Sequence, residues 1–229
     1  MDQLKKIASY SEQQLKNDQT GHGADHTNRV VKLAQQILGT EPQADPFITL
    51  VAAYLHDIID DKVVSDIDRA KAQLRDYLVE INLTKEQIES VFFIIENISF
   101  SKSFSSSKHE LTLEGKIVQD ADRLDAIGAI GILRTAYFGG GHGHPIFDPT
   151  LLPTSYTDKE TYRKGSTVIN HFYEKLLLLA DQMNTVFAKK EAKRRERFMT
   201  EFLEEFFQEW SVDDPKFTPE NWLSNKSHE

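Results

Sequence analysis

The sequence contains no cysteine, which excludes disulfide bonds, thiolate metal ligands and cysteine nucleophiles and fits a reducing compartment. Positive charge is also scarce, because 27 lysines and arginines stand against 36 aspartates and glutamates, a formal net charge of −9. A negative chain is a poor candidate for wrapping nucleic acid or an anionic membrane, where basic surface supplies most of the attraction. We therefore expect neither nucleic acid nor a membrane as a partner.

Long apolar runs are missing as well. The longest mostly apolar stretch, Phe47 to Ile59, is interrupted by Tyr54, His56 and Asp57 and is too short to span a bilayer. The N-terminal segment is too polar for a signal peptide. Because 229 residues are ample for one sizeable core, we expect one cytoplasmic domain over residues 1–229.

What the sequence does contain is a succession of helical patterns, in which apolar residues recur at spacings of three and four. Asp25 is expected to cap the second helix, and Thr84 with Gln87 resembles a capping box. The segment 47–59 is apolar on all sides and is expected to be the buried central helix. The fold class expected is an all-α bundle, with helices over 4–15, 25–38, 47–59, 66–79, 84–98, 113–138, 167–180 and 184–210.

His56 and Asp57 lie at the end of that apolar helix, and no lysine or arginine occurs in this segment before Lys62. Burying an unpaired carboxylate costs several kcal/mol or forces its protonation, so a buried Asp57 needs a cation or donors nearby. The alternative is an ordinary helix end at which both side chains reach water. This segment alone leaves the two interpretations level.

Two other helices favour a buried site. His26 lies on the apolar stripe of the second helix and is expected to face the core, although a lone core histidine need not bind anything. Asp122 and Asp125 fall on one stripe that runs from Val118 to residue 132, whereas Asp120 is expected to point elsewhere.

One divalent metal ion would explain why all of these groups turn inward. Imidazole nitrogens and carboxylate oxygens are suitable ligands for Mn²⁺, Fe²⁺, Zn²⁺ or Ni²⁺, and the ion would cancel the acidic charge. The ligand set expected is His26, His56, Asp57 and Asp122. Asp125, one turn further along the helix, is expected to orient a ligand or to contact substrate.

This pattern resembles the HD superfamily of metal-dependent phosphohydrolases, which is named for a His…His-Asp…Asp ligand set. The resemblance extends from about residue 21 to residue 210. It implies an HD-domain helical bundle, with the metal-site core at about 21–138 and helices of 167–210 packed on it. Three segments, 118–132, 148–149 and 170–175, are similar to a narrower group of small bacterial single-domain HD proteins. One of these is described as a nucleoside triphosphate pyrophosphohydrolase.

The resemblance also implies a function. A single metal ion is expected, with Mn²⁺ first and Mg²⁺, Fe²⁺, Ni²⁺, Co²⁺ or Zn²⁺ as alternatives. The substrate expected is a small-molecule nucleotide, with cleavage of a (deoxy)nucleoside triphosphate to monophosphate and pyrophosphate ranked first. The alternatives are a 5′-nucleotidase, another phosphomonoesterase or phosphodiesterase, and a nucleotide-sensing HD protein without turnover. The oligomeric state is left open between monomer and homodimer.

Several residues beside the motif receive expected roles. In related nucleotide pyrophosphohydrolases an acidic residue, often glutamate, lies three positions after the His-Asp pair and assists the attacking water. Asp60 occupies that place here, followed by Asp61 as a second catalytic candidate. The charges of the neighbouring Asp57 and Asp61 would raise the pKa of Asp60. The substrate-binding candidates are Arg29, Lys62, Arg123 and Asp125, although each single Lys or Arg more often lies on solvated surface.

Three later segments have two interpretations each. The glycine-histidine segment 139–145 is a flexible connection with incidental histidines, or a mobile lid. The basic run 189–197 is interrupted by glutamates and is expected to form an ion-paired helix face rather than a nucleic-acid contact. Aromatic residues at 198, 202, 206 and 210 form a stripe that is expected to be core, with a homodimer seam as the alternative.

Overall fold

The computed structural model describes residues 2–16, 21, 23–61, 63–99, 109–155, 166–210 and 218–224. Within these ranges the regular secondary structure is helical and contains no strand, which confirms the all-α fold class. Among the described helices none is both long enough and apolar enough to cross a bilayer. Contacts divide the chain into two compact units, Met1–Asp122 and Arg123–Glu229, and the boundary falls inside one helix.

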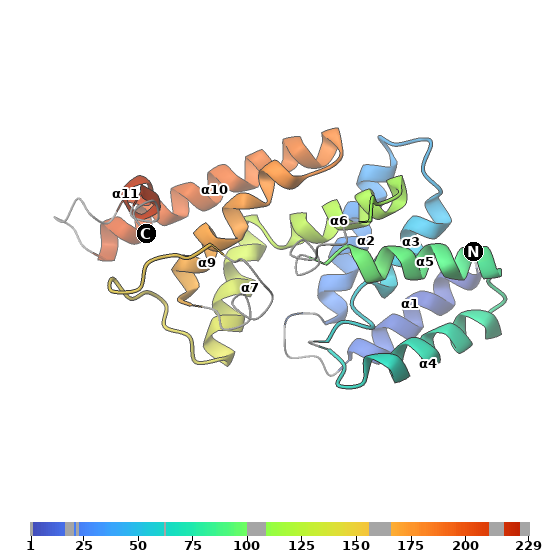
Figure 1. Ribbon diagram of the computed structural model, residues 1–229. Coiled ribbons are helices and arrows are strands. Elements are labelled where there is room, and N and C mark those ends of the chain that lie inside the picture. The colour runs from blue at the N-terminus through green and yellow to red at the C-terminus, as the bar shows by residue number, and fades with distance from the viewer. Residues whose placement is uncertain are drawn as a thin grey trace. The chain divides into compact units, whose positions relative to one another are not determined.

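The first unit is built around one apolar helix (Figure 1). Its helices are α1 (Asp2–Leu15), α2 (Ala24–Leu38), α3 (Pro46–Leu55), α4 (Ile67–Glu80), α5 (Lys85–Asn97) and most of α6 (Leu113–Asp125). Helix α3 packs against α1, α2 and α5, so the expectation that this segment is central is confirmed. The carboxylate of Asp45 accepts hydrogen bonds from the amides of Phe47 and Ile48, which fixes where α3 begins.

The helix starts were predicted with mixed success. The capping box of Thr84 and Gln87 at the start of α5 is confirmed. The expectation that Asp25 caps α2 is wrong, because the cap residue is Gly23 and Asp25 lies in the first turn. The Asp25 carboxylate accepts a hydrogen bond from Arg29, one turn later, at 2.7 Å. An acid in the first turn is still favourable, because it faces the positive end of the helix dipole.

The second unit gathers around a long helix, α10 (Val186–Trp210), which packs against α7 (Gly128–Gly141) and α11 (Pro219–Ser224) (Figure 1). Helix α9 (Val168–Glu174) contacts α7 and leads into two 3₁₀ turns, Leu176–Leu178 and Ala180–Gln182. The indole nitrogen of Trp222 donates a hydrogen bond to the Asn170 side chain at 3.0 Å, which ties α11 to α9.

The single helix predicted over 113–138 is in fact two helices with a sharp corner. Helix α6 ends at Asp125, Ile127 is extended (φ −125°, ψ 163°), and α7 begins at Gly128 with φ +80°. That positive φ is a conformation that glycine adopts without the cost other residues incur. A β-carbon on Gly131 would lie 2.2 Å from the carbonyl oxygen of Ala126, so the corner also requires a glycine there. Because the corner changes the helix phase, the predicted stripe does not continue, and Ala129 is exposed.

The buried face of α10 also differs from the prediction. Its core side chains are Ala188, Ala192, Met199, Leu203 and Phe207. The expectation that the aromatic stripe is core is wrong for Phe198, Phe202 and Trp210, which are 47%, 36% and 49% exposed.

The basic run of α10 forms ion pairs, as expected. The pairs join Lys193 to Asp181 and Glu196, and Glu191 to Arg194 and Arg195.

Candidate metal centre

His26 lies in the first turn of α2 and is fully buried. The apolar face of this helix, which includes Val30 and Ile37, packs into the core of the first unit. The histidine occurs at the same phase as these residues, so its ring turns inward with them. The prediction that His26 faces the core is confirmed.

His56 and Asp57 follow the last residue of α3, where the chain leaves the helix in a turn, and both are buried. The Nδ1 atom of His56 lies 2.9 Å from the carbonyl oxygen of Ala53. Because a carbonyl oxygen can only accept, Nδ1 carries the proton of the neutral ring and Nε2 keeps its lone pair. Such a bond orients an imidazole for metal binding.

Asp122 lies in the last turn of α6, with its side chain 33% exposed. Its Oδ1 atom is 3.5 Å from Nε2 of His26 and 3.9 Å from Nε2 of His56. These three residues form a group whose ligand atoms all lie within 4.8 Å of one another.

Asp57 approaches the same two rings. Its Oδ2 atom lies 3.3 Å from Nε2 of His26 and 3.2 Å from Nε2 of His56, and the two Nε2 atoms are 3.1 Å apart. Ligand atoms bonded to one ion at ~2.1 Å are separated by roughly 3 Å, so this spacing fits a shared cation. Two imidazole lone pairs at this separation repel unless a proton or a cation lies between them. The structure therefore brings together nitrogen and oxygen donors that could hold a divalent metal ion.

The electrostatics of the site also favour a cation. Burial alone would lower the pKa of His56, but the neighbouring Asp57 carboxylate, with Asp122 and the Ala53 carbonyl, raises this pKa to about 9. The carboxylates thus favour positive charge at the His56 imidazole, and a bound metal ion would supply positive charge there in place of the proton.

Comparisons with known proteins agree with this geometry. The family model of the HD domain matches residues 23–127. YpgQ of Bacillus subtilis is 37% identical over 201 residues, which are 88% of this chain and 90% of YpgQ. The chain belongs to the HD superfamily.

Solved structures of three bacterial proteins are similar over nearly the whole length. A protein of Lactobacillus plantarum has 45% identity and a TM-score of 0.84, covering 93% of this chain and 98% of its own. YpgQ in complex with ADP has 32% identity and a TM-score of 0.72, covering 92% and 100%. A protein of Bacillus thuringiensis, described as an HD-superfamily hydrolase, has 37% identity and a TM-score of 0.72, covering 93% and 98%.

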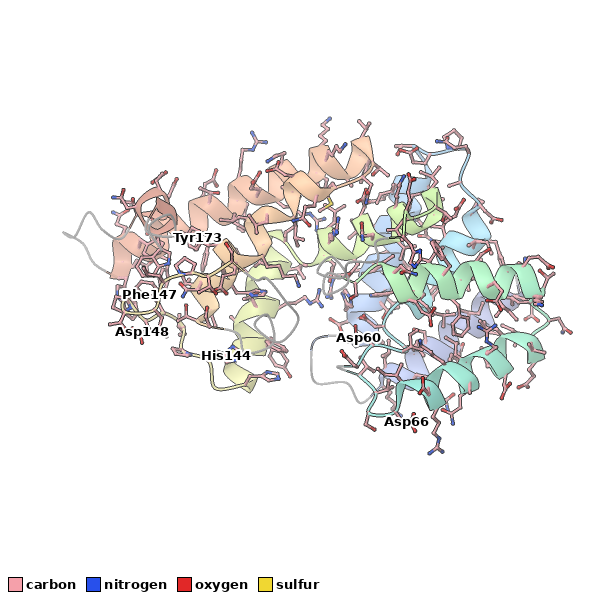
Figure 2. The ribbon with its side chains drawn as sticks, in the orientation of Figure 1. Asp60, Asp66, His144, Phe147, Asp148 and Tyr173 are labelled. Carbon is pink, nitrogen blue, oxygen red and sulfur yellow. The ribbon has the colours of Figure 1, made fainter. Side chains whose placement is uncertain are left out.

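In this HD-superfamily protein the two catalytic candidates lie in the turn that follows the His-Asp pair. Asp60, labelled in Figure 2, is half-buried, and its amide donates to the carbonyl oxygen of Asp57 at 3.0 Å. Its own carbonyl accepts hydrogen bonds from the amides of Val63 and Val64. The backbone of Asp60 is thus fixed relative to Asp57. Asp61 is half-buried beside it, and Lys62 lies outside the described residues.

The other substrate-binding candidates already have protein partners. Arg29 binds the Asp25 carboxylate. Arg123 donates to the carbonyl oxygen of Gln182 at 2.5 Å. Their roles toward a substrate stay predictions.

The fourth such candidate, Asp125, is only 2% exposed, and its Oδ2 atom accepts a hydrogen bond from Nη1 of Arg134 at 2.9 Å. Its two predicted roles, to orient a metal ligand or to contact substrate, stay predictions.

One acidic residue was misplaced by the sequence analysis. Asp120 is 0% exposed, so the expectation that it points away from the core is wrong. It lies three residues after Ile117 and four before Leu124, both fully buried, and these positions form the main core face of α6. That spacing was available in the sequence.

The two segments beyond residue 132 that resemble the narrower HD group have structural partners in the second unit. The Glu174 carboxylate, only 2% exposed, accepts hydrogen bonds from the Thr154 amide and the Ser166 hydroxyl. Asp148, close to Phe147 in Figure 2, accepts from the amide and hydroxyl of Thr150. These contacts fold the segment that follows α7.

Among the described residues, the histidines of the glycine-rich segment belong to no group of potential metal ligands. The ring of His142 stacks on Phe138 with 3.9 Å between centroids, and its Nδ1 atom lies 2.8 Å from the Phe138 carbonyl oxygen. The first residues of this segment extend α7 to Gly141.

Proposed function

We propose that this protein is a metal-dependent phosphohydrolase of nucleotides, and that it cleaves (deoxy)nucleoside triphosphates to monophosphate and pyrophosphate. The observation that carries this proposal is the convergence of two imidazoles and two carboxylates from α2, the end of α3 and α6. Membership of the HD superfamily supports it. The hydrolase description of the Bacillus thuringiensis relative and the ADP bound to YpgQ support phosphate chemistry on a nucleotide.

The ligands proposed for the ion are His26, His56, Asp57 and Asp122. Two nitrogen and two oxygen donors suit a borderline divalent ion, and we propose Mn²⁺. A divalent ion at this place would draw charge from phosphoryl oxygens and lower the pKa of a water molecule. The Ala53 carbonyl keeps the His56 ring in the tautomer that binds metal, and the two aspartates cancel the charge of the ion.

Asp60 is proposed as the base that accepts the proton of the attacking water. A general base of this kind contributes typically ~10²–10⁴-fold to the rate. Its backbone follows Asp57 in a hydrogen-bonded turn, so the geometry of the metal ligand and that of the base are linked.

The phosphates need positive partners besides the ion. Arg29 is proposed as one of them, because it lies one turn after His26 on α2 and its side chain is 30% exposed. Lys62 and Arg123 are proposed as further contacts on their nearness in sequence to Asp60 and Asp122. Charge-assisted hydrogen bonds to phosphate orient the substrate, and orientation provides much of the rate in phosphoryl transfer.

The test is product analysis with purified protein, Mn²⁺ and a panel of nucleoside mono-, di- and triphosphates. Pyrophosphate and a monophosphate in equal amounts are expected from triphosphates. Orthophosphate together with nucleoside would identify a phosphomonoesterase instead. Nucleotide binding without any product would establish the sensing alternative and overturn the proposal. The variant Asp122→Ala serves as the control for contaminating phosphatases.

A further inference from the structure

The last metal ligand lies immediately before the corner between α6 and α7. Asp122 is in the last turn of α6, which ends three residues later at Asp125. His56 is fixed by a hydrogen bond to a backbone carbonyl, whereas the Asp122 carboxylate faces the two imidazoles. The direction of the Asp122 side chain therefore depends on the helical conformation of this last turn.

An arginine from α10 caps that turn. Nη1 of Arg195 donates to the carbonyl oxygen of Leu124 at 2.6 Å. The same carbonyl oxygen accepts from the amide of Ile127 at 3.2 Å, so the arginine adds a second, charged donor. The last carbonyls of a helix carry the negative end of its dipole, where a guanidinium is favourable. Leu124 is two residues after Asp122.

The Arg195 side chain is itself held in place. Its Nε atom donates to the Glu191 carboxylate at 2.8 Å, one turn earlier on α10. Its aliphatic part lies against Gly128, where an added β-carbon would be 3.1 Å from Cγ of Arg195. The glycine thus gives the corner its positive φ and also the space that the arginine occupies.

A second charged contact fixes the same turn. The buried Asp125 carboxylate lies at the negative end of the α6 dipole, which is unfavourable for an acid. Arg134, from the second turn of α7, binds it at 2.9 Å and offsets this cost. Two arginines therefore bind the end of α6. Arg195 binds the backbone at Leu124, and Arg134 binds the side chain of the last residue, Asp125.

We propose that Arg195 is a positioning residue of the metal centre, which holds the last turn of α6 so that the Asp122 carboxylate stays beside the two imidazoles. This inference rests on the metal centre of the proposed function, but it does not depend on which nucleotide is hydrolysed. Its consequence is that α10, remote in sequence from every proposed ligand, contributes to metal affinity.

The test compares two neighbouring arginines. Arg195→Met removes the bond to Leu124 but keeps the aliphatic stem against Gly128. Arg194→Met is the matched control, because Arg194 also binds Glu191 but is 62% exposed, and its hydrogen bonds stay within α10. Loss of a group that orients a metal ligand costs about ten- to a hundred-fold in affinity, and we expect the lower end of this range. Mn²⁺ affinity is measured by the paramagnetic resonance of the free ion, and Co²⁺ is used as a spectroscopic probe.

We expect Arg195→Met to bind Mn²⁺ about ten-fold more weakly and to show an altered visible spectrum with Co²⁺. Arg195→Lys should recover part of the affinity, and Arg194→Met should match the wild type. A folded Arg195→Met protein with wild-type affinity and spectrum would overturn the inference, even if it melts earlier. If Arg195→Met does not fold, Arg195→Lys decides, and unchanged affinity in that variant overturns it. Wild-type protein that binds Mn²⁺ but hydrolyses nothing would refute only the proposed function.

Discussion

The proposed metal centre in the first unit and the α6–α7 corner in the second both bury charged side chains, but with different partners. At the proposed metal centre the carboxylates of Asp57 and Asp122 face two imidazoles. At the corner the Asp125 carboxylate is bound by Arg134. A carboxylate paired with a guanidinium indicates a structural role, whereas carboxylates that converge on imidazoles, which can themselves bind a metal ion, indicate a binding site.

The largest effect is expected from removing a ligand. Asp122→Ala should abolish Mn²⁺ binding and lower nucleotide hydrolysis by at least about a thousand-fold, because the ion stabilises the transition state by several kcal/mol. The unfolding temperature of the metal-free protein should change by less than about 4 °C, since the variant removes a partly exposed charge and no core volume. Calorimetric titration and thermal unfolding measure the two quantities. The control is Asp76→Ala, an exposed acid of α4, and full activity in Asp122→Ala would refute the site.

A next, smaller effect is expected from the proposed base. Asp60→Asn keeps the size and the backbone of the turn but cannot accept a proton, so turnover should fall by ~10²–10⁴-fold while Mn²⁺ affinity is kept. Single-turnover kinetics with saturating metal measure this. Asp61→Asn is the matched variant, and it should lower turnover less. A larger loss in Asp61→Asn would assign the role of the base to Asp61 instead of Asp60. Unchanged turnover in both variants would show that neither aspartate takes part in catalysis.

Variants at the corner should lower stability more than activity, whereas variants at the proposed metal centre should lower metal binding and activity more than stability. Arg134→Met leaves a buried carboxylate without its guanidinium, and the free energy of unfolding should fall by about 3 kcal/mol. Unfolding in urea measures this loss. The double variant Asp125→Asn with Arg134→Met should recover much of the lost free energy of unfolding, because the buried negative charge of Asp125 is then absent. Arg194→Met, which breaks an exposed pair, should cost less than about 1 kcal/mol. Equal losses in Arg134→Met and Arg194→Met would contradict the contrast between the two regions.

The same contrast explains what could be predicted from the sequence. The helices of the first unit and the inward position of His26 follow from apolar residues at helical spacing, which is a local signal. The corner was missed because Gly128 and Gly131 are compatible with a helix interior, and because Arg195, which contacts Leu124 and Gly128 at the break, lies far away in the sequence. Tertiary contacts of this kind leave no periodic trace.

The errors in burial have a related cause. The burial of Asp120 was missed because the stripe was traced through the expected ligands rather than through Ile117 and Leu124. The exposed aromatic residues of α10 show the opposite error. Four-residue spacing drifts slowly around a helix, so a run of aromatics can lie beside the core face instead of on it.

The smallest expected effect is on the pH dependence of stability, which should have opposite signs in the two regions. In the metal-free protein the pKa of His56 is about 9, because Asp57 and Asp122 outweigh burial. A raised histidine pKa gives stability that is fully present below pH 6.5 and is lost as the pH rises through 9. The pKa of Glu191 in the second unit is lowered to about 2 by hydrogen bonds from Arg194 and then Arg195. This contribution is present above pH 4.5 and is lost as the pH falls through 2.

Thermal unfolding of metal-free protein across this pH range measures both contributions. The unfolding temperature of the wild type should decline between pH 6.5 and 9, and added Mn²⁺ should remove the decline because the ion replaces the proton. Glu191→Gln should weaken the acid-side loss without altering the alkaline one. A metal-free protein whose unfolding temperature is flat from pH 6.5 to 9 would mean that the two aspartates are not held against His56, and the metal centre would then lose its electrostatic basis.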